Sequence, residues 1–129
     1  MIVDTSVLVA ILFNEDDADL FANALSMSEL RLISAANYLE TCIVIDRQRG
    51  VAAGRQLDSL IVRADVRVES VTKAQADIAR QAYMDFGKGT HPAGLNFGDC
   101  FSYALAKSMR MPLLFKGEDF SLTDIESAL

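Results

Sequence analysis

The chain has 129 residues and a formal net charge of −6, from 18 acidic and 12 basic side chains. This length suits one ordinary domain, so we expect residues 1–129 to share one core. The acidic balance excludes a protein that coats nucleic acid by bulk attraction, and the two cysteines, Cys42 and Cys100, provide neither a disulfide framework nor a zinc pattern.

Short apolar segments that suit strands alternate along the chain with longer segments of helical periodicity. In chain order, the expected elements are a strand at 2–3, helices at 7–13 and 16–27, a strand at 30–34, helices at 36–49 and 52–63, a strand at 66–71, helices at 73–86 and 97–109, and a strand at 113–115. This alternation is typical of an α/β fold in which helices wrap a parallel sheet.

Caps and inner faces can be predicted for several of these helices. The first helix is expected to begin after a Thr5 or Ser6 cap. The helix at 36–49 is predicted to be buried, because apolar residues occupy position 39 and positions 42–45. The inner face of the helix at 73–86 is predicted to consist of Ala76, Ala79, Ala82 and Tyr83.

The apolar share of the chain is high, at 51%, and its mean hydropathy is +0.22. Part of this excess is expected to cover a partner surface, so we expect an oligomer. The longest clean apolar run, Val7 to Phe13, is too short to span a membrane and has no basic segment before it. We therefore expect a cytoplasmic protein.

Four carboxylates occupy positions from which they could line one pocket. Asp4 and Asp119 follow apolar strand segments, and Glu40 and Asp99 fall in the first turns of predicted helices. In a parallel sheet, the strand ends and the starts of the following helices lie at one edge, where open α/β sheets bind ligands. We therefore expect these four acids to converge on one cleft.

Acids in apolar surroundings are either paired or hold a divalent cation, because an unpaired buried carboxylate is costly. Magnesium and manganese prefer oxygen ligands, and either ion can activate water for hydrolysis of a phosphodiester bond. The pattern therefore favours a metal-dependent nuclease.

Each acid also has a purely structural interpretation. Asp99 follows a plausible Asn96 cap, and Asp4 could cap a helix or a turn. Asp119 beside Glu118 could be surface charge. His91, the only histidine, lies in a loop with no cysteine or acid at metal-ligand spacing, so histidine-based catalysis is not expected.

Four segments of the chain resemble the motifs of the PIN domain family, and more narrowly those of VapC-type ribonuclease toxins of type II toxin-antitoxin systems. They follow one another at the intervals typical of the family and are IVDTS at 2–6, YLET at 38–41, LNFGDC at 95–100 and LLFKGEDF at 113–120. The NFGDC block, continued by FSYALA, is the most specific of them.

The resemblance implies a three-layer α/β/α sandwich around a mainly parallel sheet. It also implies Mg²⁺, or Mn²⁺ as a substitute, held by Asp4, Glu40 and Asp99, with RNA as the substrate and water activated by the metal as the nucleophile. Ser6 matches the small hydroxyl residue that orients the first carboxylate. Gly117 stands where many relatives have a fourth acid, so that role would pass to Asp119 or Glu118.

The family further implies a homodimer and a VapB-like antitoxin, whose arginine could compete with the metal for the same carboxylates. Two other classes of protein are compatible with clustered acids in this fold. A receiver-like phosphoacceptor module would need an adjacent acidic pair after the first strand, whereas Asp4 stands between Val3 and Thr5. A catalytically silent PIN-fold binding module would neither bind manganese nor cleave RNA.

Overall fold

The centre of the fold is a four-stranded parallel sheet with the strand order β3-β2-β1-β4. The computed structural model describes residues 1–129, and its strands are β1 (Ile2–Val3), β2 (Arg31–Ser34), β3 (Val66–Glu69) and β4 (Leu113–Leu114). Ile2 pairs with Leu32 of β2 and with Leu113 of β4, so β1 lies inside the sheet. The predicted α/β architecture with a parallel sheet is confirmed.

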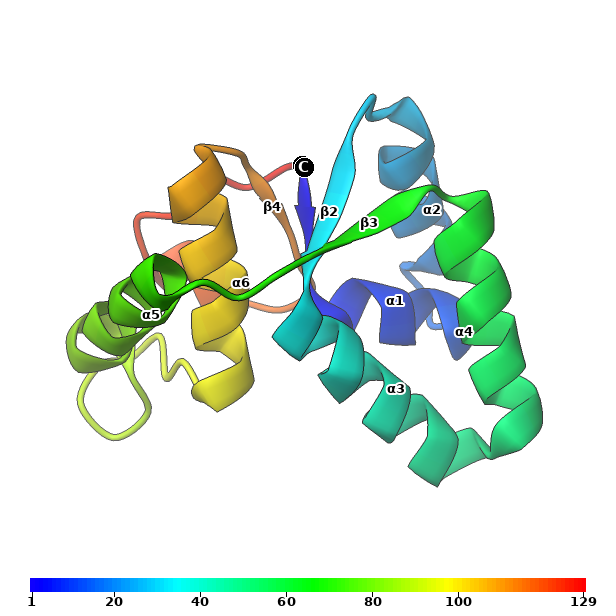
Figure 1. The fold of residues 1–129 in the computed structure, drawn as a ribbon, viewed down its shortest axis with the longest axis horizontal. Coiled ribbons are helices and arrows are strands. Elements are labelled where there is room, and N and C mark those ends of the chain that lie inside the picture. The colour runs from blue at the N-terminus through cyan, green and yellow to red at the C-terminus, as the bar shows by residue number, and fades with distance from the viewer.

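Helices cover both faces of the sheet and give the fold three layers (Figure 1). They are α1 (Thr5–Leu12), α2 (Ala18–Met27), α3 (Ala35–Arg49), α4 (Val51–Arg63), α5 (Lys73–Phe86), α6 (Phe97–Met109) and the short 3₁₀ helix η1 (Phe120–Leu122). Because successive strand residues point to opposite faces, Ile2 packs in a cluster with α5 and α6, whereas Val3 packs in a cluster with α1 to α4. None of these helices is long and apolar enough to span a membrane.

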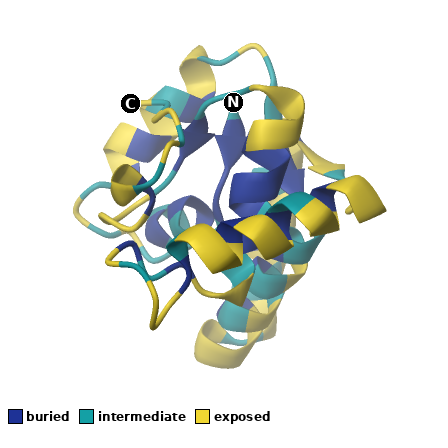
Figure 2. Ribbon diagram, turned by 90° about the vertical axis from the view of Figure 1, so that its left-hand side faces the viewer, coloured by how far each residue is buried: buried dark blue, intermediate teal, exposed yellow.

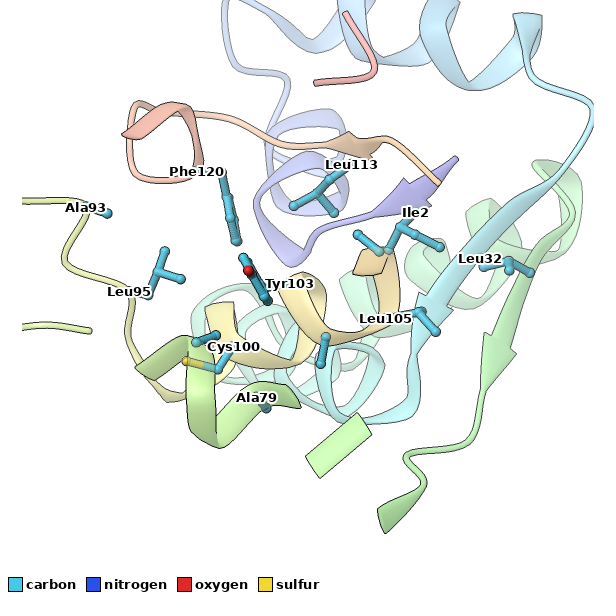
Figure 3. Packing of buried hydrophobic residues seen from close by; sticks show 13 residues of the cluster. Ile2, Leu32, Ala79, Ala93, Leu95, Cys100, Tyr103, Leu105, Leu113 and Phe120 are labelled. Carbon is cyan, nitrogen blue, oxygen red and sulfur yellow. The ribbon is translucent and has the colours of Figure 1, made fainter. Parts of the chain in front are cut away.

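The first of these clusters joins the sheet to α6 and to the C-terminal segment (Figure 3). Ile2 and Leu113 on the strands belong to it together with Tyr103 of α6 and Phe120 of η1. The buried Tyr103 ring keeps its hydroxyl satisfied by donating a hydrogen bond to Asp124, at 2.8 Å. Packing and one polar contact thus hold the C-terminal segment against α6.

The last residues of the chain cover the outer edge of β4. The Leu113 N–H donates to the Glu126 carbonyl, and the Ala128 N–H donates to the Leu113 carbonyl, both at 2.9 Å. Leu113 also forms a parallel bridge with Ser127. Only β3 therefore has an edge without a neighbouring segment.

Of the caps considered for α1, Asp4 is confirmed, whereas Thr5 and Ser6 are wrong. Asp4 is the N-cap, and its carboxylate accepts a hydrogen bond from the Ser6 N–H at 3.0 Å. A side-chain oxygen at the N-cap reaches the free amide two residues later, which neither Thr5 nor Ser6 does here. Elsewhere the expected elements are present, with ends that differ by a few residues.

Two predicted inner faces are also wrong in part. In α3, Ile45 is buried, but Leu39 and Ile43 are 58% and 49% exposed. In α5, Ala79 and Ala82 are buried, whereas Ala76 and Tyr83 face solvent. Figure 2 shows that burial is concentrated on the sheet and on the helix faces turned toward it, so an apolar residue on an outer face stays exposed whatever its hydropathy.

Candidate active site

Asp4 lies between β1 and α1, and it is buried, with only 5% of its surface exposed. Its Oδ2 accepts hydrogen bonds from the Ser6 N–H at 3.0 Å and from the Ser6 hydroxyl at 2.6 Å. Its Oδ1 accepts one from the Ser102 hydroxyl, which comes from α6. Three donors from two helices therefore fix this carboxylate in one orientation.

Ser6 also connects Asp4 to the residues that follow β4. Its hydroxyl oxygen accepts a hydrogen bond from the Lys116 N–H at 3.0 Å. The Lys116 ammonium forms ion pairs with Glu15 and with Asp17, the latter at 3.0 Å. The cationic head of Lys116 is thus bound to the α1–α2 connection, while its backbone supports the orientation of Asp4 through Ser6.

Glu40 reaches the same edge of the sheet from α3. Its Oε1 accepts a hydrogen bond from the Thr5 hydroxyl at 2.6 Å and a longer one from Asn37 Nδ2 at 3.4 Å. Asn37 is fully buried, and its Nδ2 also donates to the Gly98 carbonyl at 2.9 Å. These contacts hold the beginnings of α1, α3 and α6 together.

Gly98 allows Glu40 to lie close to α6. A Cβ atom at this position would collide with both oxygens of the Glu40 carboxylate. Because Gly98 directly precedes Asp99, the absence of a side chain brings the Glu40 carboxylate next to the first turn that carries Asp99.

Asp99 has the capping role that the sequence allows, and it also lies near other carboxylates. It forms a capping box with Asn96: the Asp99 N–H donates to Asn96 Oδ1 at 2.9 Å, and the Asn96 N–H donates to Asp99 Oδ2 at 3.0 Å. The pKa of Asp99 is nevertheless raised to about 6, first by burial and then by the charges of Asp4, Asp119 and Glu40, against the lowering effect of the Asn96 N–H. A carboxylate that only capped a helix would not carry this repulsion.

Asp4, Glu40 and Asp119 therefore lie close enough to Asp99 for their charges to act on it. Asp119 is exposed at the start of η1, and its charge acts on Asp99, whereas no such effect comes from Glu118. No three acidic, histidine or cysteine side chains are close enough together in this structure to enclose a metal ion. The donor set still suits magnesium, because Glu40 Oε2 and Asp99 Oδ1 accept no hydrogen bond and this ion usually takes only one or two carboxylates with waters.

The sequence does not predict that Thr5, Asn37 and Ser102 support the acids; it indicates a role only for Thr5, as a helix cap. Asn37 and Ser102 are fully buried, and each contacts a segment distant in the sequence. The available signal is a polar residue within an otherwise apolar helix face, as at Ser102 between Phe101 and Tyr103. That signal indicates a buried hydrogen bond but does not identify its partner.

The chain belongs to the PIN domain family, whose model matches residues 1–126. Ribonuclease VapC28 of Mycobacterium tuberculosis is 57% identical to it, over 100% of this chain and 98% of that protein. Ribonuclease VapC of Mycolicibacterium smegmatis is 55% identical, over 97% of each chain. The predicted family is therefore confirmed, and a receiver-like module is not supported.

Two solved structures share the fold. The crystal structure of Mycobacterium tuberculosis VapC20, described as a toxin that cleaves the sarcin-ricin loop, superimposes with a TM-score of 0.76 at 22% identity, over 96% of this chain and 95% of that one. A toxin-antitoxin complex from Klebsiella pneumoniae gives a TM-score of 0.69 at 14% identity, over 93% of this chain and 89% of that one. These matches confirm the predicted α/β/α sandwich.

The raised pKa of Asp99 predicts a specific pH dependence of stability. The pKa is about 6 in the folded protein against an ordinary value of 3.8, so the free energy of unfolding should fall as the pH rises from about 4 to above 6. We expect Asp99→Asn to stabilise the metal-free protein at pH 7.5, because asparagine can still accept the cap hydrogen bond but carries no charge. The expected gain in the free energy of unfolding is roughly 1 kcal/mol, after allowance for the partial exposure of Asp99. Urea denaturation at several pH values measures this.

Asp124→Asn is the control, because it should change the free energy of unfolding in the opposite direction. A hydrogen bond from Lys107 lowers the pKa of Asp124, so this substitution should destabilise the protein at pH 7.5, and its effect should disappear as the pH falls below 3.8. If both variants shifted stability in the same direction at pH 7.5, the electrostatic account of Asp99 would be wrong.

Gly98→Ala is expected to displace Glu40. Alanine in a helix normally stabilises a protein by up to about 1 kcal/mol relative to glycine. Here, however, the collision with the Glu40 carboxylate would break the Thr5–Glu40 hydrogen bond, which is worth about 1.5–3 kcal/mol because its acceptor is charged. We expect a net loss of about 1 kcal/mol in urea denaturation. Gly54→Ala is the matched control, because its Cβ would meet only the exposed Asp46 side chain, and it should stabilise.

A double-mutant cycle gives the decisive comparison. In a Glu40→Ala background the collision is absent, so Gly98→Ala should become stabilising there. An unchanged effect in that background would show that the cost of the substitution does not come from Glu40.

Proposed function

We propose that residues 1–129 form one nuclease domain that acts as a metal-dependent endoribonuclease, the toxin of a toxin-antitoxin pair. The observation that carries this proposal is the convergence of Asp4, Glu40, Asp99 and Asp119 at one sheet edge, in a chain whose full-length relatives are VapC ribonucleases. The protein is a ribonuclease of the VapC type. Its metal dependence and the roles of individual residues are the finer parts of the proposal.

Asp4, Glu40 and Asp99 would hold a magnesium ion, or manganese in its place. A bound cation lowers the pKa of a water molecule and stabilises charge on a phosphate undergoing hydrolysis. Ser6 and Ser102 orient the Asp4 carboxylate, and Thr5 together with Asn37 orients Glu40. These supporting hydroxyl and amide groups keep the carboxylates in fixed orientations, as partners behind metal ligands generally do.

The engagement of the only histidine limits the type of cleavage. His91 packs edge-on against Phe86, and its Nδ1 accepts a hydrogen bond from the Ala93 N–H, so it is engaged in its own loop. No other histidine is present in the chain. We therefore propose hydrolysis by water without use of the RNA 2′-hydroxyl as nucleophile, which leaves 5′-phosphate and 3′-hydroxyl ends.

The partner proteins follow from the same assignment. The Klebsiella structure is a toxin-antitoxin complex, which supports a VapB-like antitoxin as a partner of this chain. An antitoxin arginine could form a bidentate, charge-assisted contact with Asp4 or Asp99 and exclude the cation. A homodimer is supported by apolar side chains left exposed on outer faces, such as Leu39 and Ile43 of α3.

The first test is cleavage of total cellular RNA by antitoxin-free protein. We expect discrete cuts with 5′-phosphate ends in magnesium or manganese, none with chelator, and a loss of at least about 100-fold in Asp4→Asn and Asp99→Asn, because even supporting residues of metal sites are worth 10–100-fold. Mapping the fragment ends by sequencing identifies the RNA and the cleavage chemistry together. Products with 2′,3′-cyclic phosphate ends would falsify the proposed mechanism.

The fourth acid can be identified by a matched pair of variants. Because the charge of Asp119 acts on Asp99 and that of Glu118 does not, Asp119→Asn should lower the cleavage rate by roughly 10-fold and Glu118→Gln should leave it near the wild-type value. The same assay under magnesium measures both rates. A larger loss in Glu118→Gln would reverse this assignment.

A further inference from the structure

An apolar groove with a volume of about 500 Å³ lies between α5 and the start of α6. The residues that matter for its chemistry are Arg80 and Tyr83 of α5, Lys88 of the following turn, and Asn96, Phe97 and Phe101 at the start of α6. We call it the α5–α6 groove. Its size is within the range of small-molecule sites, roughly 300–1,000 Å³.

Two aromatic rings in this groove face solvent. Phe97 is 78% exposed and Tyr83 is 48% exposed, although neither position is at a chain end. Phe101 makes an edge-on contact with the Phe97 ring, with centroids 4.9 Å apart. This contact supports the Phe97 ring from one side and leaves most of its surface free for a planar ligand.

Two cations at the groove make no ion pair and no side-chain hydrogen bond. They are Arg80 and Lys88, and both are exposed. The other charges of α5 are engaged elsewhere, because Lys73 pairs with Asp77 at 2.8 Å and Asp85 accepts a hydrogen bond from Gln81 at 3.0 Å. The groove therefore presents positive charge beside apolar rings on a protein whose net charge is −6.

The groove adjoins the candidate active site through the first turn of α6. Asn96 lines the groove and is joined to Asp99 by both hydrogen bonds of the capping box. A nucleic acid strand whose phosphate lies at the acids would therefore have a neighbouring nucleotide close to Phe97.

We propose that the α5–α6 groove binds an unpaired nucleotide next to the scissile phosphate of the RNA. The base stacks on Phe97 and Tyr83, and the backbone phosphate pairs with Arg80 and Lys88. Stacking platforms flanked by basic side chains are how proteins bind single-stranded RNA. This inference rests on the proposed ribonuclease function.

A second copy of the chain is a less suitable occupant. An apolar protein face laid over this groove would contact the aromatic rings but provide no negative charge for Arg80 and Lys88. A nucleotide provides a flat π surface and a negative charge together, so it matches both features of the groove.

The test measures binding of a fluorescently labelled, mixed-sequence single-stranded RNA of roughly 12 nucleotides, a length suited to single-strand sites. The background is Asp99→Asn in magnesium, so that binding is measured without cleavage. We expect Phe97→Ala to weaken binding about 10-fold and Tyr83→Ala to weaken it less. Met84→Ala is the matched control, since Met84 is exposed on α5 but outside the groove, and its affinity should not change.

Charge is tested in the same assay at several salt concentrations. Arg80→Gln and Lys88→Gln should each weaken binding and reduce the salt dependence of the affinity, because each removes one phosphate contact. Lys73→Gln is the control, because Lys73 already pairs with Asp77 and lies outside the groove. Equal effects of all three substitutions would contradict a local phosphate contact at the groove.

A direct signal is available because the chain has no tryptophan. Phe97→Trp should retain RNA affinity, and its indole fluorescence should be quenched when a base stacks on it. Absence of quenching together with wild-type affinity in Phe97→Ala would overturn the inference. Light scattering measures the oligomeric state of Phe97→Ala. A changed oligomeric state together with unchanged RNA affinity would show that the groove contacts a second copy of the chain, and would also overturn the inference.

Failure of this inference is distinguishable from failure of the proposed function. If wild-type protein cleaves RNA and Phe97→Ala cleaves it with unchanged KM, only the nucleotide site is wrong. If folded wild-type protein neither binds nor cleaves RNA, the ribonuclease proposal and the nucleotide site both fail.

Discussion

The structure depends on the need to satisfy one buried carboxylate. Asp4 follows the central strand β1 and has almost no contact with solvent. A carboxylate in such a position is tolerated only if several hydrogen-bond donors surround it. Ser6, Ser102 and, through Ser6, the backbone of Lys116 provide that support from α1, α6 and the residues after β4. The same hydrogen bonds that make the charge acceptable fix how these elements meet at the sheet edge.

Structural and chemical roles coincide in the candidate site. Asp4 caps α1 and Asp99 closes the capping box of α6, so each acid stabilises the beginning of a helix. The two acids also lie near each other, and although burial is the main reason for the raised pKa of Asp99, the charges of Asp4, Asp119 and Glu40 add to it. Local helix stability thus offsets part of the electrostatic cost of gathering negative charge, a common compromise where function requires strained electrostatics.

The sequence predicts the alternation of strands and helices and places the four acids at the correct edge, because both depend on local patterns and on a general rule of parallel sheets. It does not predict which side of a helix is covered. Leu39 and Ile43 are apolar yet exposed, since the elements packed against α3, namely α1, α4, α6, β2 and β3, decide which of its faces is buried. Nor does it predict the partners of Asn37 and Ser102, which lie 61 and 98 residues away along the chain.

The pairing of residues 126–128 with β4 has a consequence for assembly. A free strand edge can accept a strand from another chain, whether a partner or an aggregating copy. Here the C-terminal segment occupies that position beside β4. The strand at the opposite edge, β3, carries Arg67 and Glu69, and these charges disfavour unintended pairing with another strand. Any protein that extends this sheet by strand addition must do so at β3, so the direction in which the sheet can grow is determined by the last four residues of the chain.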